Sequence, residues 1–206
     1  MLHGLLGGVA GVITAVISHG GYVGIIFLMA LESACLPLPS EVIMPFAGYL
    51  AASGRFDLIV VGICGAIGCN LGSAAAYAVG AHAGPGFVRR WGRYLLIDGA
   101  SVGWAERLFA RFGGVTVFGG RLLPVVRTFI ALPAGVARMG LGRFHIYTFA
   151  GSLIWSMALA YAGYVLGRNW DNSPGLRRVM SGLDGVAVLL LVCGGVYFLW
   201  RKPRAR

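Results

Sequence analysis

Four charged side chains lie inside long apolar stretches of this chain: Glu32, Glu41, Arg121 and Arg127. A charged residue at the centre of a membrane-spanning helix costs about 2.5 to 3.5 kcal/mol to insert, so it needs a partner or a function. The guanidinium fork of arginine matches the oxygen atoms of a phosphate and stays charged at any working pH. We therefore expect Arg121 and Arg127 to bind an anionic phosphate group.

The two carboxyl groups suit a different task, the binding and release of protons. A glutamate that exchanges apolar surroundings for an arginine neighbour changes its affinity for a proton, which is what proton coupling requires. Glu32 and Glu41 are both candidates, and the sequence does not choose between them. In the alternative interpretation, the four charges form ion pairs that only lock neighbouring segments together, or some of them reach water.

Metal, cofactor and hydrolase chemistry find little support. The four cysteines stand singly, without a CxxC pair or a histidine at metal-ligand spacing. No GxSxG, HExxH or Walker sequence occurs. We therefore expect no metal, no cofactor and no catalytic residue, and a protein that is not an enzyme. An intramembrane enzyme acting on lipid phosphates, or a scaffold without transport activity, remains the alternative from another class.

The segments that carry these charges are typical of a membrane protein. Hydrophobic residues make up 58% of the 206 residues and charged residues 12%, and the mean hydropathy is +0.80. We predict an all-α polytopic membrane protein, because each spanning helix needs about 20 apolar residues and several charge-free runs approach or exceed this length. The runs at 58–86, 144–167 and 185–200 are predicted to span, and 2–17 is either a thin span or an interfacial helix.

Two further apolar stretches, about 24–52 and 113–139, combine the four charges with prolines. The first contains Pro37, Pro39 and Pro45, and the second contains Pro124 and Pro133. Proline breaks a helix, and in lipid the freed backbone groups must bind to protein or to water in a cavity. We therefore predict two re-entrant hairpins, each with a helix, a break and a second helix.

The two hairpins also begin an internal repeat. Pro37 falls on Pro124 at an offset of 87 (124 − 37), and Pro45 falls on Pro133 at an offset of 88 (133 − 45). Ala47-Gly48 likewise falls on Ala134-Gly135. Within a single membrane domain, 1–206, we place repeat 1 at about 24–86, an interfacial helix or cytoplasmic loop at 87–112, repeat 2 at about 113–167 and a C-terminal transmembrane helix at 185–200.

The distribution of Lys and Arg predicts the orientation, because cytoplasmic loops of membrane proteins are enriched in both. If 87–112 is cytoplasmic, that side holds eleven of the 17: Arg89, Arg90, Arg93, Arg107, Arg111, Arg138, Arg143, Arg201, Lys202, Arg204 and Arg206. The other side holds four: Arg55, Arg168, Arg177 and Arg178. Both termini are then cytoplasmic, the hairpins enter from opposite faces, and the repeat is an inverted one, as in transporters.

Small and aromatic residues receive structural interpretations. Gly68, Gly72 and Gly80 form a small-residue face at helical spacing, which predicts close helix packing and no phosphate-binding loop. Tyr77, Tyr164 and Trp155 are expected to be packing residues or part of an interfacial aromatic belt. The net charge of +10 is explained by the loop arginines, so we expect no nucleic-acid partner.

Two motifs together resemble the DedA family, also called SNARE-associated or VTT-domain membrane proteins. One is Glu32-Ser-Ala-Cys-Leu-Pro-Leu-Pro-Ser-Glu41 with Ala47-Gly48, and the other is Gly120-Arg121-x-x-Pro124-x-x-Arg127 with Ala134-Gly135 and Met139. The resemblance covers about 24–167. The chain departs from the family pattern at Gly72-Ser73, where many members have Gly-Asp, and at Ser40, Ala81 and His82.

The resemblance implies two re-entrant hairpins and the movement of lipids between membrane leaflets. By resemblance, Arg121 and Arg127 bind substrate, and Glu32 and Glu41 are the acidic hairpin residues. We expect a flippase or scramblase for undecaprenyl (polyprenyl) phosphate in the bacterial cytoplasmic membrane, with protons as the coupling ion and membrane lipids as partners. A general phospholipid translocase is the nearest alternative, and a homo-oligomer is left open.

Overall fold

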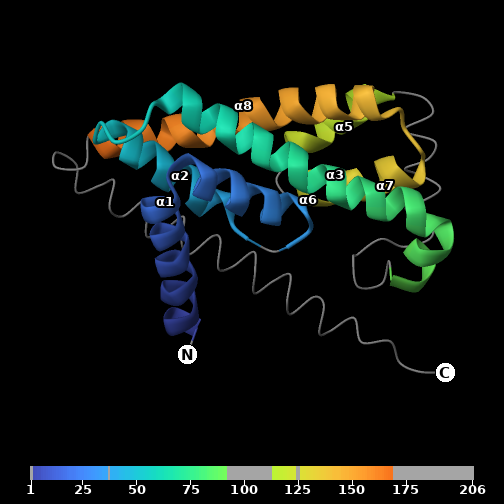
Figure 1. Ribbon diagram of the computed structural model, residues 1–206, viewed down its shortest axis with the longest axis horizontal. Helices are drawn as coiled ribbons and strands as arrows, with labels where there is room; N and C mark the ends of the chain where they lie inside the picture. The colour runs from blue at the N-terminus through green and yellow to red at the C-terminus, as the bar shows by residue number, and fades with distance from the viewer. Residues whose placement is uncertain (1, 37, 92–112, 124–125, 169–206) are drawn as a thin grey trace.

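The structure of the chain is a computed structural model that describes residues 2–36, 38–91, 113–123 and 126–168. Its elements, shown in Figure 1, are α1 (Leu2–Ser33), α2 (Ser40–Ala52), α3 (Leu58–Trp91), α5 (Gly114–Arg121), α6 (Val126–Phe129), α7 (Ala131–Val136) and α8 (Leu141–Arg168). Every element in the described ranges is helical. Of the interfacial helix or loop predicted at 87–112, residues 87–91 belong to α3 and 92–112 lie outside the described residues, as does the predicted C-terminal transmembrane helix at 185–200.

Three helices in the described part of the chain are long and apolar enough to cross a membrane. Leu58–His82 and Leu141–Gly167 confirm the predicted spans at 58–86 and 144–167, although α3 continues to Trp91. The third candidate, Gly11–Ser33, contains a kink at Gly21, whose φ of 56° and ψ of −137° no helix adopts. The segment of α1 before this kink runs at a steep angle to α3 and α8 (Figure 1).

Each of the two proline-containing stretches forms helices separated by a break, and the first helix of the first stretch is the end of α1. α1 ends where Cys35 takes a φ of 69° and the Leu36 N–H donates to the Leu31 carbonyl at 3.3 Å, which is the 6→1 bond of a Schellman motif. Pro39 is extended and precedes α2. α2 and α5 have 13 and 8 residues, so they are about 20 and 12 Å long, too short to cross a ~30 Å hydrocarbon layer.

The two halves of the described chain pack on each other reciprocally. α1 packs on α3 and α5 on α8, whereas α2 packs on α8 and α7 packs on α3. Glycines permit the two crossed contacts, because a Cβ at Gly48 would meet the Ala160 carbonyl and one at Gly135 would meet the Tyr77 carbonyl. Gly68 and Gly72 lie against α1 and Gly80 against α7, which confirms their predicted role in helix packing.

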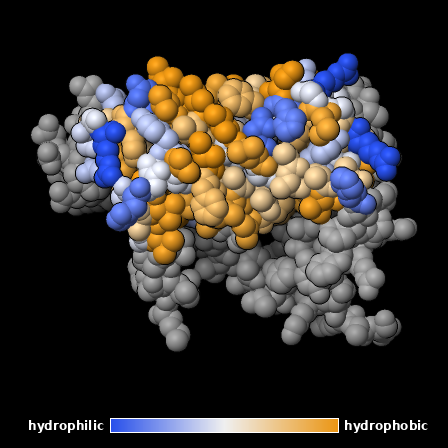
Figure 2. Space-filling model, viewed as in Figure 1, coloured by the Kyte–Doolittle hydropathy of each residue, from blue (hydrophilic) through white to orange (hydrophobic). Residues whose placement is uncertain are grey.

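Two hydrophobic clusters support this arrangement. One includes Ile25, Met29 and Met44, and the other includes Leu132 and Phe144. Many large apolar side chains remain exposed outside these clusters, on α1, α3 and α8 among others. On the face shown in Figure 2 they form a broad central band, and hydrophilic residues gather mostly toward the two ends of the long axis. Such a band is what a surface in contact with lipid requires.

Candidate functional site

A buried ion pair joins the first proline-containing stretch to the second. Glu32, in the last turn of α1, accepts hydrogen bonds from Nη2 of Arg127 on α6, at 3.0 Å to Oε1 and 2.9 Å to Oε2. Both residues are nearly inaccessible, with 4% and 2% of their surface exposed. The Ser33 hydroxyl also donates to Glu32 Oε2, at 3.3 Å. The predicted meeting of an acidic and a basic residue therefore occurs for Glu32 and Arg127.

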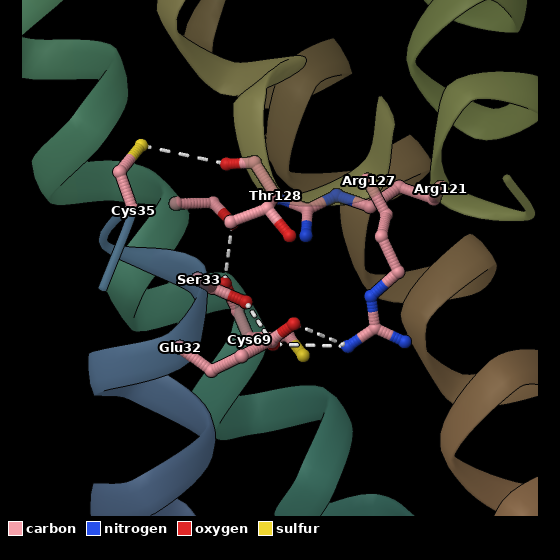
Figure 3. Close-up of polar contacts among 8 residues, drawn as sticks. Glu32, Ser33, Cys35, Cys69, Arg121, Arg127 and Thr128 are labelled. Carbon is pink, nitrogen blue, oxygen red and sulfur yellow. Dashed lines mark hydrogen bonds and ion pairs between the residues drawn. The ribbon is translucent and has the colours of Figure 1, made fainter. Parts of the chain in front are cut away.

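This ion pair occupies only one end of the Arg127 guanidinium. Both carboxylate oxygens bind the same nitrogen, and Figure 3 shows the other terminal nitrogen pointing away from Glu32. That nitrogen, Nη1, is buried and has no hydrogen-bond partner among the described residues. The guanidinium carbon lies 5.1 Å from the centre of the Trp155 ring, which is within the range of a cation–π contact.

Arg121, at the end of α5, is buried to the same degree but lacks a carboxylate partner among the described residues. Its Nη2 donates to the hydroxyl of Ser73 on α3, and that hydroxyl donates to the Cys69 carbonyl. Its Nε is buried and has no acceptor in the part of the chain that the structure describes. α5 approaches α8 here because residue 151 is a glycine: a Cβ at Gly151 would lie 2.7 Å from the Arg121 Cβ.

The structure brings together three of the four predicted charges. Arg121, Arg127 and Glu32 carry two positive charges and one negative charge, which leaves one positive charge in buried surroundings. Glu41 lies apart from this pairing: it is exposed in the first turn of α2 and forms no ion pair within the described residues. The interpretation in which ion pairs only lock the segments therefore accounts for Arg127, but it leaves Arg121 without a counter-ion in the described ranges.

Two contributors to this cluster, Ser73 and Trp155, were not predicted as site residues. Trp155 was expected to be a packing or belt aromatic, and no local pattern distinguishes it from one. Ser73 did carry a signal, because it departs from the family motif at the residue after Gly72. Tyr77 does pack as expected, with its ring 4.7 Å from that of Phe144 and its hydroxyl donating to the Met139 carbonyl.

No group of three or more His, Cys, Asp or Glu side chains in the described residues is placed to hold a metal ion. The donors of the cluster are instead guanidinium, indole and hydroxyl groups. Guanidinium and indole groups can only donate hydrogen bonds, so this cluster is suited to an anion.

The chain shares its sequence with a known group of membrane proteins. Residues 38–165 match the family model of the VTT domain. The chain is 34% identical over 191 residues to the uncharacterized membrane protein YkoX of Bacillus subtilis, which covers 90% of this chain and 81% of that protein. It is 31% identical over 189 residues to undecaprenyl phosphate transporter A of the same organism, covering 92% of each chain.

A third relative carries a different name. An alkaline phosphatase-like protein of Lactococcus lactis is 33% identical over 193 residues, covering 91% of this chain and 87% of that protein. No significant match was found among solved structures. The apolar helices, the two motifs around Glu32 and Arg121, and the match over 38–165 agree, and the chain therefore belongs to the VTT-domain (DedA) family of membrane proteins.

Proposed function

We propose that this protein translocates a lipid phosphate, of the undecaprenyl (polyprenyl) phosphate class, across the bacterial cytoplasmic membrane. The observation that carries the proposal is that each of the two buried arginines has an N–H donor without an acceptor among the described residues. Nε of Arg121 and Nη1 of Arg127 are buried without acceptors, and one positive charge of the pair has no counter-ion in the described residues. A phosphate group would supply both the acceptors and the negative charge.

The relatives support the same substrate class. Undecaprenyl phosphate transporter A of Bacillus subtilis matches this chain over 92% of both proteins. At 31% identity the resemblance extends along the chain and is not confined to one motif. A general phospholipid translocase remains the nearest alternative, because a phosphodiester head group would also offer oxygen atoms to the two arginines.

The packing is consistent with an inverted repeat built from two re-entrant hairpins. α2 crosses to α8 and α7 crosses to α3, so each hairpin reaches the long helix of the other repeat. The crossed contacts use Gly48 and Gly135, which occupy equivalent positions at the 87-residue offset. We place repeat 1 at about 24–86 and repeat 2 at about 113–167. Opposed hairpins of this kind suit a site that opens alternately to the two faces of a membrane.

Proton coupling is assigned to Glu32 in preference to Glu41. Glu32 neutralises Arg127 in the empty protein, so an arriving phosphate competes with it for the same guanidinium. A carboxylate released from its arginine inside an apolar environment gains affinity for protons. Glu41 is exposed and contacts neither arginine through an ion pair in the described residues, so it lacks this link to the substrate.

The name of the Lactococcus lactis relative favours one second candidate, an enzyme that hydrolyses lipid phosphates. Such an enzyme would release inorganic phosphate from the same lipid that a transporter moves intact. The two functions are therefore separable in one preparation.

The test uses the full chain reconstituted into vesicles with a short-chain polyprenyl phosphate. Transport is followed as the appearance of the phosphate head group on the opposite leaflet, and free phosphate is assayed in parallel. Competition with phosphatidylethanolamine and phosphatidylglycerol measures head-group selectivity. Translocation of the intact polyprenyl phosphate is expected. Release of free phosphate at the rate of lipid loss would establish the enzyme instead, and failure to move the lipid would refute the proposal.

A further inference from the structure

One face of α8 carries buried polar groups that have no hydrogen-bond partners among the described residues. These are the hydroxyls of Thr148, Ser152 and Ser156 and the indole N–H of Trp155. The three hydroxyl residues are at most 3% exposed. Positions 148, 152, 155 and 156 fall within one helical face. Buried polar atoms in native proteins nearly always have partners, so a row without them is a place where a ligand or water can supply hydrogen bonds.

Part of this row adjoins the two arginines. Arg121 packs against Gly151, whose Cβ position would lie 2.7 Å from the arginine Cβ, and the Arg127 guanidinium lies 5.1 Å from the Trp155 ring. In sequence Ser152 falls between Gly151 and Trp155, within the same turn of α8. Thr148 and Ser156 lie about one turn to either side, so the complete row follows about 12 Å of the helix. Ser152 and Trp155 are therefore the α8 residues best placed to share a ligand with the arginines.

The chemistry of the unpartnered groups specifies the ligand. Arg121 Nε, Arg127 Nη1 and Trp155 Nε1 are all N–H donors, and a serine hydroxyl can donate as well. Such a set is incomplete without an acceptor that has several lone pairs directed to different sides. A phosphate has this arrangement, and a neutral alcohol has a single oxygen atom.

We propose that Ser152 and Trp155 are head-group ligands that complete the hydrogen-bond shell of the lipid phosphate whose charge Arg121 and Arg127 balance. This inference rests on the proposed function and adds residues of α8 to the phosphate site formed by Arg121 on α5 and Arg127 on α6. Trp155 has two roles in it: its ring face holds the Arg127 guanidinium, and its N–H points to the phosphate. Ser152 contributes its hydroxyl one residue after Gly151, where Arg121 packs against α8.

Ser152→Ala gives the sharpest test, because its two readouts should move differently. The Ser152 hydroxyl has no partner among the described residues, so its removal should leave the thermal stability of the lipid-free protein unchanged or raise it. The same change should weaken binding of a short-chain polyprenyl phosphate about 10-fold or more, because a hydrogen bond to a charged group is lost. A merely structural serine would lower stability and leave the affinity unchanged.

Trp155→Phe supplies the second measurement. It keeps a ring over Arg127 but removes the N–H, and we expect about a 10-fold weaker affinity for the phosphate. Tyr161→Phe is the matched control, because it removes a polar group from an exposed aromatic residue on the same helix. Its affinity should equal that of the unmodified protein.

Equilibrium binding of the short-chain polyprenyl phosphate to the purified full chain is compared with binding of the corresponding neutral polyprenol. This comparison tests the arginine site separately from the roles of Ser152 and Trp155. If the unmodified protein binds phosphate and alcohol equally, the arginine site itself is refuted and this inference falls with it. If it prefers the phosphate, and both Ser152→Ala and Trp155→Phe keep that preference in full, the arginine site stands and water serves the α8 groups, which overturns the inference alone. A selective loss of phosphate affinity in either folded variant supports it.

Discussion

Replacing Glu32 by Gln should destabilise the empty protein and strengthen its binding of an anionic lipid. The two effects have opposite signs because Glu32 has two roles in the proposed cycle. In the empty protein its carboxylate is the ion-pair partner of Arg127, at 2.9 Å, in surroundings that exclude water. During binding it competes with the phosphate for that arginine.

The magnitudes follow from burial and charge. Removing one partner of a buried ion pair destabilises a protein by about 3 to 5 kcal/mol, and glutamine keeps a hydrogen-bond acceptor, so we expect a loss of about 3 kcal/mol. For binding, a phosphate on Nη1 of Arg127 would lie roughly 6 Å from the carboxylate. Two unit charges at that distance repel by about 3 kcal/mol at an effective dielectric constant of 20, so removing the repulsion strengthens binding by about 100-fold.

The pH dependence of phosphate binding tests the competition between carboxylate and phosphate independently. When binding of the phosphate is coupled to protonation of Glu32, affinity rises as the pH falls, because the complex holds one proton more than the free protein. Glu32→Gln removes this proton and should flatten the profile. The phosphate group itself titrates near pH 6 and contributes equally to both proteins, so the difference between the two profiles isolates the carboxyl group.

The assay is equilibrium binding of a short-chain polyprenyl phosphate to purified protein between pH 5.5 and 8.5, combined with thermal unfolding of the empty protein. Glu41→Gln is the control, because Glu41 is exposed and forms no ion pair in the described residues. Its phosphate binding should still tighten as the pH falls, because Glu32 is present to take up the proton. Weaker phosphate binding in Glu32→Gln, or a pH profile identical to that of the unmodified protein, would refute competition between carboxylate and phosphate.

Three further predictions concern transport, packing and topology. Arg127→Lys should slow transport about 10-fold or more while the protein still folds, because lysine keeps the charge but loses the planar fork, and exposed Arg143→Lys should have no effect in the same vesicle assay. Gly151→Ala should destabilise the fold by about 1 to 3 kcal/mol in thermal unfolding, because its Cβ would lie 2.7 Å from the Arg121 Cβ, whereas Gly142→Ala meets no atom within 4 Å. A cysteine at exposed Ser53, in a variant without its own four cysteines, should react with an impermeant thiol reagent from outside intact cells; labelling only after lysis would reverse the proposed orientation.

Much of the architecture could be predicted from the residues because lipid imposes a local rule. Any window of about 20 apolar residues without charge is predicted to span the membrane, independently of the rest of the chain. The helices α3 and α8 follow this rule, and their predicted ranges are confirmed. The same rule made Glu32, Arg121 and Arg127 conspicuous, since charges within apolar stretches need an explanation. Family membership was also predictable, because its motifs are local runs of sequence.

The partners of these charges could not be predicted in this way. The contact between Glu32 and Arg127 joins residues 95 positions apart, and that between Ser73 and Arg121 joins residues 48 positions apart. Hydropathy and spacing treat Glu32 and Glu41 alike, and they treat Trp155 as one aromatic residue among several. Only the crossing of α1, α5, α6 and α8 decides that Glu32 is buried against an arginine while Glu41 is exposed. Such long-range pairing depends on which helix faces approach each other, and a linear pattern of residue types does not encode that approach.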